Sequence, residues 1–291
     1  MKLKYTRTLF AVMAFVVAAS TSAAAFDGES KYAKLDGARI HYKSYGKGRD
    51  ALVLIHGWGG NIDSWRDQIP ELAKRNRVMA LDLPGHGESD KPEISYSMDL
   101  FANAIDAVMR DAKVERAVVM GHSMGTPIAR QFYRKYPQKT LGLVIVDGGL
   151  RPFGTKEMRD QFLAMFRGPN YKEAVAQMFS QMMPTLPPAD QERVKTSFSN
   201  TPQHVLVSAM ESMTQESLYG PDKISVPVLA ILAKSPFWQP DTEEFLHSLA
   251  PDLELQWFQG VDHFLMMEKS KEFNEAVIAF LNKKTLLKKK T

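Results

Sequence analysis

Short, continuous apolar segments recur along the chain, each of a length typical of one strand buried on both faces of a sheet. They are residues 51–55, 77–81, 117–120, 141–146, 226–232 and 253–258. Ahead of them, residues 31–35 and 38–45 alternate polar and apolar side chains on either side of Asp36-Gly37, the pattern of a β-hairpin. The pattern therefore predicts a hairpin followed by six buried strands.

Helical patterns separate most of the buried strands. Apolar residues recur at spacings of three and four in residues 62–74, 98–112, 126–136, 242–249 and 271–282. Strands that alternate with helices in this way form a mostly parallel sheet with helices on both faces. The chain is therefore predicted to belong to the α/β class.

One interval, residues 150–222, breaks the alternation because it has no convincing strand. Its spacing predicts helices at residues 156–166, 171–182, 189–198 and 203–216, with proline and glycine between them. The interval follows the sixth strand, so we expect a helical cap inserted there. Residues 26–149 and 223–282 would then form the core of a single folded unit, and residues 283–291 a basic tail.

The first 25 residues have the pattern of a secretory signal peptide. A cationic start ends at Arg7, residues 9–19 are apolar, and Ala23 and Ala25 supply a small-residue cleavage site. The apolar run is shorter than the roughly 20 residues of a stable membrane span. We expect cleavage after Ala25 and a periplasmic or secreted protein without stable membrane insertion; an uncleaved N-terminal anchor is the alternative.

Composition narrows the chemistry further. The chain has no cysteine, which excludes a disulfide scaffold, a cysteine-ligated zinc site and a thiol nucleophile. The net charge of +4 comes largely from the two ends, since three positive charges lie before residue 26 and five after residue 282. The folded body is therefore acidic, and we expect no nucleic-acid partner. Histidine and carboxylate spacings predict no metal site.

The segment Gly121-His122-Ser123-Met124-Gly125 follows one buried strand and precedes a predicted helix. A serine in that context sits on a tight strand-to-helix turn, with its Oγ exposed at the carboxyl edge of the sheet. An ordinary glycine-rich turn is the alternative. The flanking pattern favours Ser123 as a nucleophile.

A second glycine-rich loop, His56-Gly-Trp-Gly-Gly60, follows an earlier buried strand. Acyl transfer needs N–H donors aimed at the developing oxyanion. We expect the backbone N–H groups of Trp58 and Met124 to form this oxyanion hole. The Trp58 side chain would then line the substrate pocket, and His56 is expected to hydrogen-bond within its loop.

His263 directly follows the last apolar strand and precedes the final helix. A loop histidine at that edge can reach toward Ser123 and act as the general base, in the chain order serine, acid, histidine. His41, His204 and His247 lack such a position and are expected in the core or on the surface. His86 and His122 lie in glycine-rich motifs where packing roles are expected.

These motifs together resemble the α/β-hydrolase superfamily of single-domain enzymes with a helical cap. The matching elements, in order, are residues 56–60, the Asp82-Leu-Pro-Gly-His-Gly-Glu-Ser89 loop, the Ser123 turn and the His263 loop. The resemblance covers roughly residues 31–282. It implies a hydrolase that needs no cofactor, with its site between sheet and cap, and it leaves the substrate open.

The acid of the expected triad is ambiguous. Many relatives carry it after the seventh strand, where this chain reads Ala233-Lys-Ser-Pro-Phe-Trp with no carboxylate. Asp147, at the end of the sixth strand, is the preferred candidate. Asp241 is the alternative, although its position before residues 242–249 also predicts a helix N-cap with a capping box.

The cap is rich in methionine and aromatic residues, which suit an adaptable apolar surface or simply the cap's own packing. Trp58 and Phe264 flank the expected site and favour an apolar small-molecule substrate. We therefore expect a serine esterase that cleaves carboxylic esters of small or medium apolar acids. Amide, lactone or C–C bond hydrolysis by the same triad, or a ligand-binding protein on this fold, remain alternatives.

Overall fold

An eight-stranded sheet forms the centre of the computed structural model, which describes residues 28–287. The strand order is β1-β2-β4-β3-β5-β6-β7-β8, with β1 and β2 antiparallel to their neighbours and the remaining pairs parallel. The strands are β1 (Glu29–Leu35), β2 (Ala38–Tyr45), β3 (Asp50–Ile55), β4 (Val78–Leu81), β5 (Arg116–His122), β6 (Thr140–Val146), β7 (Val228–Ala233) and β8 (Leu253–Phe258). The predicted α/β class is confirmed.

Both faces of strands β3 to β7 are buried, which explains their continuous apolar runs. The prediction of a buried strand is wrong for β8, which lies at the edge of the sheet and is half-buried except at Phe258. On β3, Val53 and Ile55 belong to one buried cluster, whereas Leu52 and Leu54 belong to the other. The first cluster includes side chains of α2 (Met98–Asp111), α3 (Gly125–Lys135) and α8 (Thr242–Leu249). The second includes side chains of α1 (Ile69–Leu72), α9 (Leu265–Glu268) and α10 (Ser270–Lys283).

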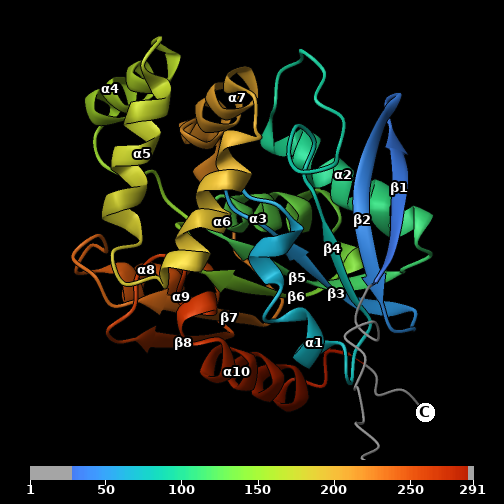
Figure 1. Ribbon diagram of the computed structural model, residues 1–291. Coiled ribbons are helices and arrows are strands. Elements are labelled where there is room, and N and C mark those ends of the chain that lie inside the picture. The colour runs from blue at the N-terminus through green and yellow to red at the C-terminus, as the bar shows by residue number, and fades with distance from the viewer. Residues whose placement is uncertain (1–27, 288–291) are drawn as a thin grey trace, which may run out of the picture.

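Four helices between β6 and β7 form the cap (Figure 1). They are α4 (Lys156–Arg167), α5 (Tyr171–Met182), α6 (Pro188–Ser199) and α7 (Gln203–Met213). A separate 3-10 turn, η4 (Glu216–Tyr219), follows α7, so the last predicted cap helix ends earlier than its pattern suggested. The cap stands over the carboxyl ends of the central strands, where catalytic residues of such sheets gather.

The predicted helix over residues 62–74 is wrong as one element. The structure has a short 3-10 helix, η2 (Ile62–Trp65), and then α1. Pro70 lies in the first turn of α1, a position that tolerates its missing N–H, whereas a continuous helix would have placed it in the interior. The side chain of Asn61 accepts the Asp63 N–H and fixes the start of η2.

The predicted signal peptide, residues 1–25, lies outside the described residues, as does the end of the basic tail, residues 288–291. Within residues 28–287, no helix combines the length and the apolar character needed to cross a membrane.

Candidate active site

Ser123 lies on a sharp turn between β5 and α3. Its φ of 53° is in the left-handed region, which costs an L-residue roughly 1–2 kcal/mol and is typical of functional turns. The turn closes only because Gly121 has no side chain, since a Cβ there would lie 2.0 Å from the carbonyl oxygen of Gly125. The local sequence therefore builds the tight strand-to-helix turn that its motif predicts, with Ser123 half-buried at the cavity wall.

The Gly57–Gly60 loop packs directly against this turn. A Cβ on Gly57 would lie 3.1 Å from the Cβ of Ser123, so the two backbones approach as closely as glycine allows. In the described chain no group accepts a hydrogen bond from the N–H of Trp58 or Met124. Both amides are therefore available as oxyanion donors beside Ser123.

His263 and Asp147 are joined by a hydrogen bond of 2.7 Å between Nδ1 and Oδ2, although 116 residues separate them in sequence. Asp147 follows the last residue of β6 with a φ of 43°, a second left-handed residue at the site. Its other oxygen, Oδ1, accepts the Ala233 N–H at 2.8 Å. The carboxylate thus has a fixed orientation and directs the His263 ring toward the cavity.

His122 holds the loop that carries His263. Its Nε2 lies 2.9 Å from the carbonyl oxygen of His263 and must donate, because that oxygen can only accept. Burial holds the pKa of His122 well below its usual range, so the ring is neutral. Its ring centroid lies 4.7 Å from that of His263. The sequence motif predicts only a packing role for His122, and its position next to Ser123 is the feature that could have indicated a role in holding the His263 loop.

Asp241 lies elsewhere, at the start of α8. Its carboxylate binds the Arg151 guanidinium through contacts of 2.6 and 3.0 Å, which hold the pKa of Asp241 below its usual range. The predicted capping box is wrong, because the Asp241 side chain makes no hydrogen bond to the helix N–H groups. The Asp241 carboxylate therefore pairs with Arg151 instead of with the helix N–H groups. The carboxylate that bonds to His263 is that of Asp147, not that of Asp241.

A cavity of about 970 Å³ lies between sheet and cap. Ser123, His263, Trp58 and Phe264 line it from the sheet side. The cap contributes mainly apolar side chains, among them Phe162, Met178, Phe179, Met182, Met210 and Met213. In the described part of the chain, no cluster of His, Asp and Glu is arranged to hold a metal ion.

Trp58 both lines this cavity and fastens the cap. Its indole N–H donates to the Leu206 carbonyl oxygen of α7 at 2.8 Å. Its ring also meets those of Phe166 and Phe198 edge-on, with centroids 4.9 and 4.7 Å apart. The expected pocket-lining side chain is therefore also a structural contact between core and cap.

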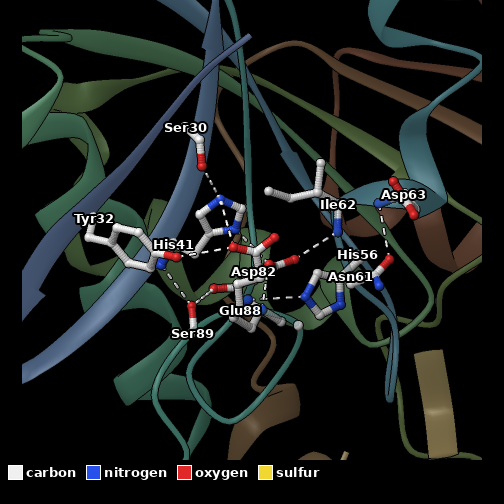
Figure 2. Close-up of polar contacts among 12 residues, drawn as sticks. Ser30, Tyr32, His41, His56, Asn61, Ile62, Asp63, Asp82, Glu88 and Ser89 are labelled. Carbon is white, nitrogen blue, oxygen red and sulfur yellow. Dashed lines mark hydrogen bonds and ion pairs between the residues drawn. The ribbon is translucent and has the colours of Figure 1, made fainter. Parts of the chain in front are cut away.

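A second polar group joins the β1–β2 hairpin to the loop after β4 (Figure 2). Ser30 Oγ lies 2.8 Å from His41 Nε2, and His41 Nδ1 lies 2.8 Å from Asp82 Oδ2. The Asp82 carboxylate also accepts the N–H groups of Ile62 and Glu88. Sequence reasoning missed this group, because the hairpin histidine gives no motif that points to its partner.

His56 supports the loop of the oxyanion donors, as expected. Its Nε2 accepts the Leu83 N–H at 3.0 Å, so its Nδ1 carries the proton and donates to the Gly57 carbonyl oxygen at 2.7 Å. Burial lowers the pKa of His56, which keeps this neutral tautomer in place. The ring ties the loop after β3 to the loop after β4.

Comparison with known proteins agrees with this architecture. A family model described as the alpha/beta hydrolase fold matches residues 50–171. The first curated relatives are 36% to 37% identical over their matched segments, and the chain spans only 31% to 35% of their length. A 2-hydroxy-6-oxononadienedioate/2-hydroxy-6-oxononatrienedioate hydrolase of Burkholderia vietnamiensis is 28% identical, over 87% of this chain and 96% of its own length.

Solved structures share the whole architecture. An esterase from Exiguobacterium antarcticum superposes with a TM-score of 0.79 at 19% identity, covering 87% of this chain and 100% of its own. An enzyme described as degrading N-acyl homoserine lactones superposes with a TM-score of 0.73 at 27% identity, covering 86% of this chain and 100% of its own. With the family model and the eight-stranded sheet, these matches show that the chain has the α/β-hydrolase fold.

Proposed function

We propose that this protein is a serine hydrolase that cleaves carboxylic esters of small or medium apolar acids. The observation that carries the proposal is the 2.7 Å bond between His263 Nδ1 and Asp147 Oδ2 beside Ser123, at the floor of an apolar cavity. A histidine so oriented keeps its Nε2 free to take a proton from a nucleophile.

The reaction would proceed through an acyl-enzyme. Ser123 Oγ attacks the ester carbonyl carbon while His263 Nε2 takes the hydroxyl proton, which it then delivers to the leaving alcohol. The N–H groups of Trp58 and Met124 stabilise the oxyanion of the tetrahedral intermediate. Asp147 holds the tautomer and stabilises the imidazolium. Water then attacks the acyl-enzyme, again with His263 as base, and releases the acid.

The cavity wall supports an apolar acyl group. Its cap side is built mostly from methionine and phenylalanine side chains, and Phe264 is 7% exposed beside His263. Flexible methionines can repack around acyl groups of different shapes. The volume of about 970 Å³ is at the upper end for small-molecule sites, so medium-length acyl chains are well accommodated.

Lactone and C–C bond hydrolysis form the second candidate. One solved structure described above is of an enzyme that degrades N-acyl homoserine lactones, and one relative is described as a hydrolase of 2-hydroxy-6-oxononadienedioate, a keto acid without an ester bond. The same serine, base and oxyanion donors serve these reactions, so the relative kcat/KM values across substrates decide between them. A kcat/KM for esters about tenfold or more above those for N-acyl homoserine lactones and for 2-hydroxy-6-oxononadienedioate would support the leading proposal.

The test is hydrolysis of p-nitrophenyl acetate, butyrate and octanoate by the purified protein. We expect turnover by the wild type, with butyrate or octanoate preferred over acetate, and none by Ser123→Ala. Ser235→Ala is the matched control, because Ser235 also lines the cavity, and it should keep at least half of the activity. A wild type that neither turns over esters nor reacts with an organophosphonate would instead support the ligand-binding alternative.

Export belongs to the same proposal. The sequence pattern of residues 1–25 predicts that the mature protein begins at Phe26 in the periplasm or the medium. Mass spectrometry of the protein from an exporting host measures this directly. A membrane-bound product that begins at Met1 would support the uncleaved anchor.

A further inference from the structure

The backbone of His263 is held from two sides. On one side, His122 donates to its carbonyl oxygen. On the other, the His263 N–H donates at 3.3 Å to the carbonyl oxygen of Met182, the last residue of cap helix α5. The position of the candidate general base therefore depends on the cap as well as on the sheet.

Thr185, three residues beyond α5, adds a larger contact to the same loop. Its N–H and Oγ1 both lie 2.6 Å from Asp262 Oδ2, and its Oγ1 lies 2.5 Å from Glu268 Oε2. Glu268 Oε1 in turn accepts the Asp262 N–H at 2.8 Å. We call Thr185, Asp262 and Glu268 the α5 latch. One of its members, Asp262, is the residue immediately before His263.

The rest of the cap is fastened elsewhere. Ser208 and Ser212 of α7 accept the N–H groups of Tyr96 and Met98 at 2.8 and 2.9 Å. Ser197 of α6 donates to the Gly59 carbonyl oxygen at 2.9 Å. These bonds hold α6 and α7 against the core without involving the His263 loop. Figure 1 shows α5 running from the far end of the cap, beside α4, toward the α9 end of the sheet.

The two attachments differ in exposure. Ser212 is 8% exposed and Tyr96 is fully buried, whereas Thr185 is an exposed residue. Hydrogen bonds that compete with water contribute little net free energy and are readily exchanged. The α7 contacts are thus suited to a permanent joint, and the α5 latch to one that opens and closes.

We infer that Thr185 is a positioning residue, and that docking of α5 through the latch sets the His263 loop in its catalytic position. The inference rests on the proposed function for its kinetic consequence. When the latch is closed, Asp262 and Glu268 fix the start of the loop, and Met182 and His122 fix the backbone of His263. When it opens, the imidazole loses its support from the cap while Asp147 remains bonded to it.

The experiment compares Thr185→Val with Thr185→Ser in the full-length mature protein. Valine has the shape of threonine without the hydroxyl, and serine restores the hydroxyl. Hydrogen–deuterium exchange of the peptide covering residues 260–264, without substrate, should be about threefold to tenfold faster in Thr185→Val. With p-nitrophenyl butyrate, kcat should fall by about the same factor with less than a twofold change in KM. Thr185→Ser should restore both values.

Thr196→Val is the matched control, since Thr196 is exposed on α6 and outside the latch. It should leave exchange and kcat unchanged. Unaltered exchange of residues 260–264 in Thr185→Val would overturn the inference, as would equally faster exchange in the peptide covering β3, which would indicate global destabilisation. A wild type inactive on every ester would remove the proposed function, while the exchange measurements would still decide whether the latch holds the loop.

Discussion

Two groups of serine, histidine and aspartate can be compared within residues 28–287, and both contain a histidine–aspartate hydrogen bond but lie in different surroundings. In the Ser30–His41–Asp82 group both hydrogen bonds are formed, each 2.8 Å long. In the Ser123–His263–Asp147 group the histidine–aspartate bond is 2.7 Å long, and all three residues line the large cavity. Ser30, by contrast, lies in regular strand β1, on the exposed surface of the hairpin.

The difference shows that the order of polar atoms alone does not identify a catalytic group. Ser123 and Asp147 both have left-handed backbones at the carboxyl ends of strands, which indicates strain kept for a function. Free N–H donors flank Ser123. The Asp82 carboxylate instead accepts two backbone N–H groups besides His41, so it serves as a structural junction between two loops and the hairpin.

Among substitutions of the aspartates and of Ser30, the largest effect should come from Asp147→Asn. The Ala233 N–H bonds to Asp147 Oδ1 and should keep the amide oxygen of Asn in that place, which turns the amide NH₂ toward His263 Nδ1. The imidazole would then carry its proton on Nε2 and could not take one from Ser123. We expect kcat to fall by about 10⁴-fold with little change in Tm, in line with the effect on serine-protease triads.

Asp241→Asn is the matched control for that loss. It weakens the ion pair with Arg151 on a carboxylate that is largely exposed, and such pairs contribute at most about 1 kcal/mol. We expect kcat within threefold of the wild type on the same ester. Full activity in Asp147→Asn together with a large loss in Asp241→Asn would exchange the roles of the two carboxylates.

Asp82→Asn should produce the opposite profile, with a loss of stability and little loss of chemistry. The substitution removes charge from a carboxylate that is 3% exposed and accepts three hydrogen bonds. Bonds to a buried charge are worth about 1.5–3 kcal/mol each, and Asn keeps some of them. We expect the free energy of unfolding to fall by about 2–3 kcal/mol in urea titrations, with kcat/KM of the folded protein within threefold of wild type.

The difference in free energy of unfolding between wild type and Asp82→Asn should also depend on pH, which gives a finer test. Burial would raise the pKa of Asp82, but the bond from His41, the nearby His56 and the two backbone N–H groups outweigh it, so the pKa lies below its usual value. An acid with a lowered folded-state pKa stabilises the fold fully above its unfolded value of about 3.9 and loses that contribution as the pH falls through the folded value. The difference in free energy of unfolding between wild type and Asp82→Asn should be constant from about pH 6 to 8 and should become smaller below about pH 4.

Much of the fold could be predicted because the spacing of apolar residues within a segment indicates whether it forms a strand or a helix. The β8 and α8 boundaries match their predicted ranges, since the pattern of apolar residues along a strand and their three-to-four spacing along a helix are properties of the segment itself. The prediction of one helix over residues 62–74 is wrong because the apolar spacing continues across Pro70, whereas the backbone begins a new helix there. Proline and glycine between the apolar patterns indicate where the cap helices begin and end. The bounds of α5 agree with that prediction.

Sequence alone could predict those residues of the site that directly follow a recognisable strand. Ser123 and His263 could be named because the strand before each fixes its edge of the sheet. Contacts across long sequence distances could not be named in this way. The bonds from His41 to Asp82 and from Thr185 to Asp262 join residues 41 and 77 positions apart, and each depends on how separately recognisable elements pack.

The smallest effect should come from Ser30→Ala, which is also the sharpest test of the comparison. Activation of a serine needs a base, but productive acyl transfer also needs oxyanion donors and a site that holds the substrate. Ser30 has the base and lies on an exposed strand, so its hydroxyl contributes one solvent-accessible hydrogen bond, worth about 0.5–1 kcal/mol or less. We expect unchanged kcat and a Tm within about 2 °C of wild type. In Ser123→Ala, peptide mapping after organophosphonate treatment should find no adduct on Ser30; an adduct there that disappears in His41→Ala would make the hairpin group a second reactive site.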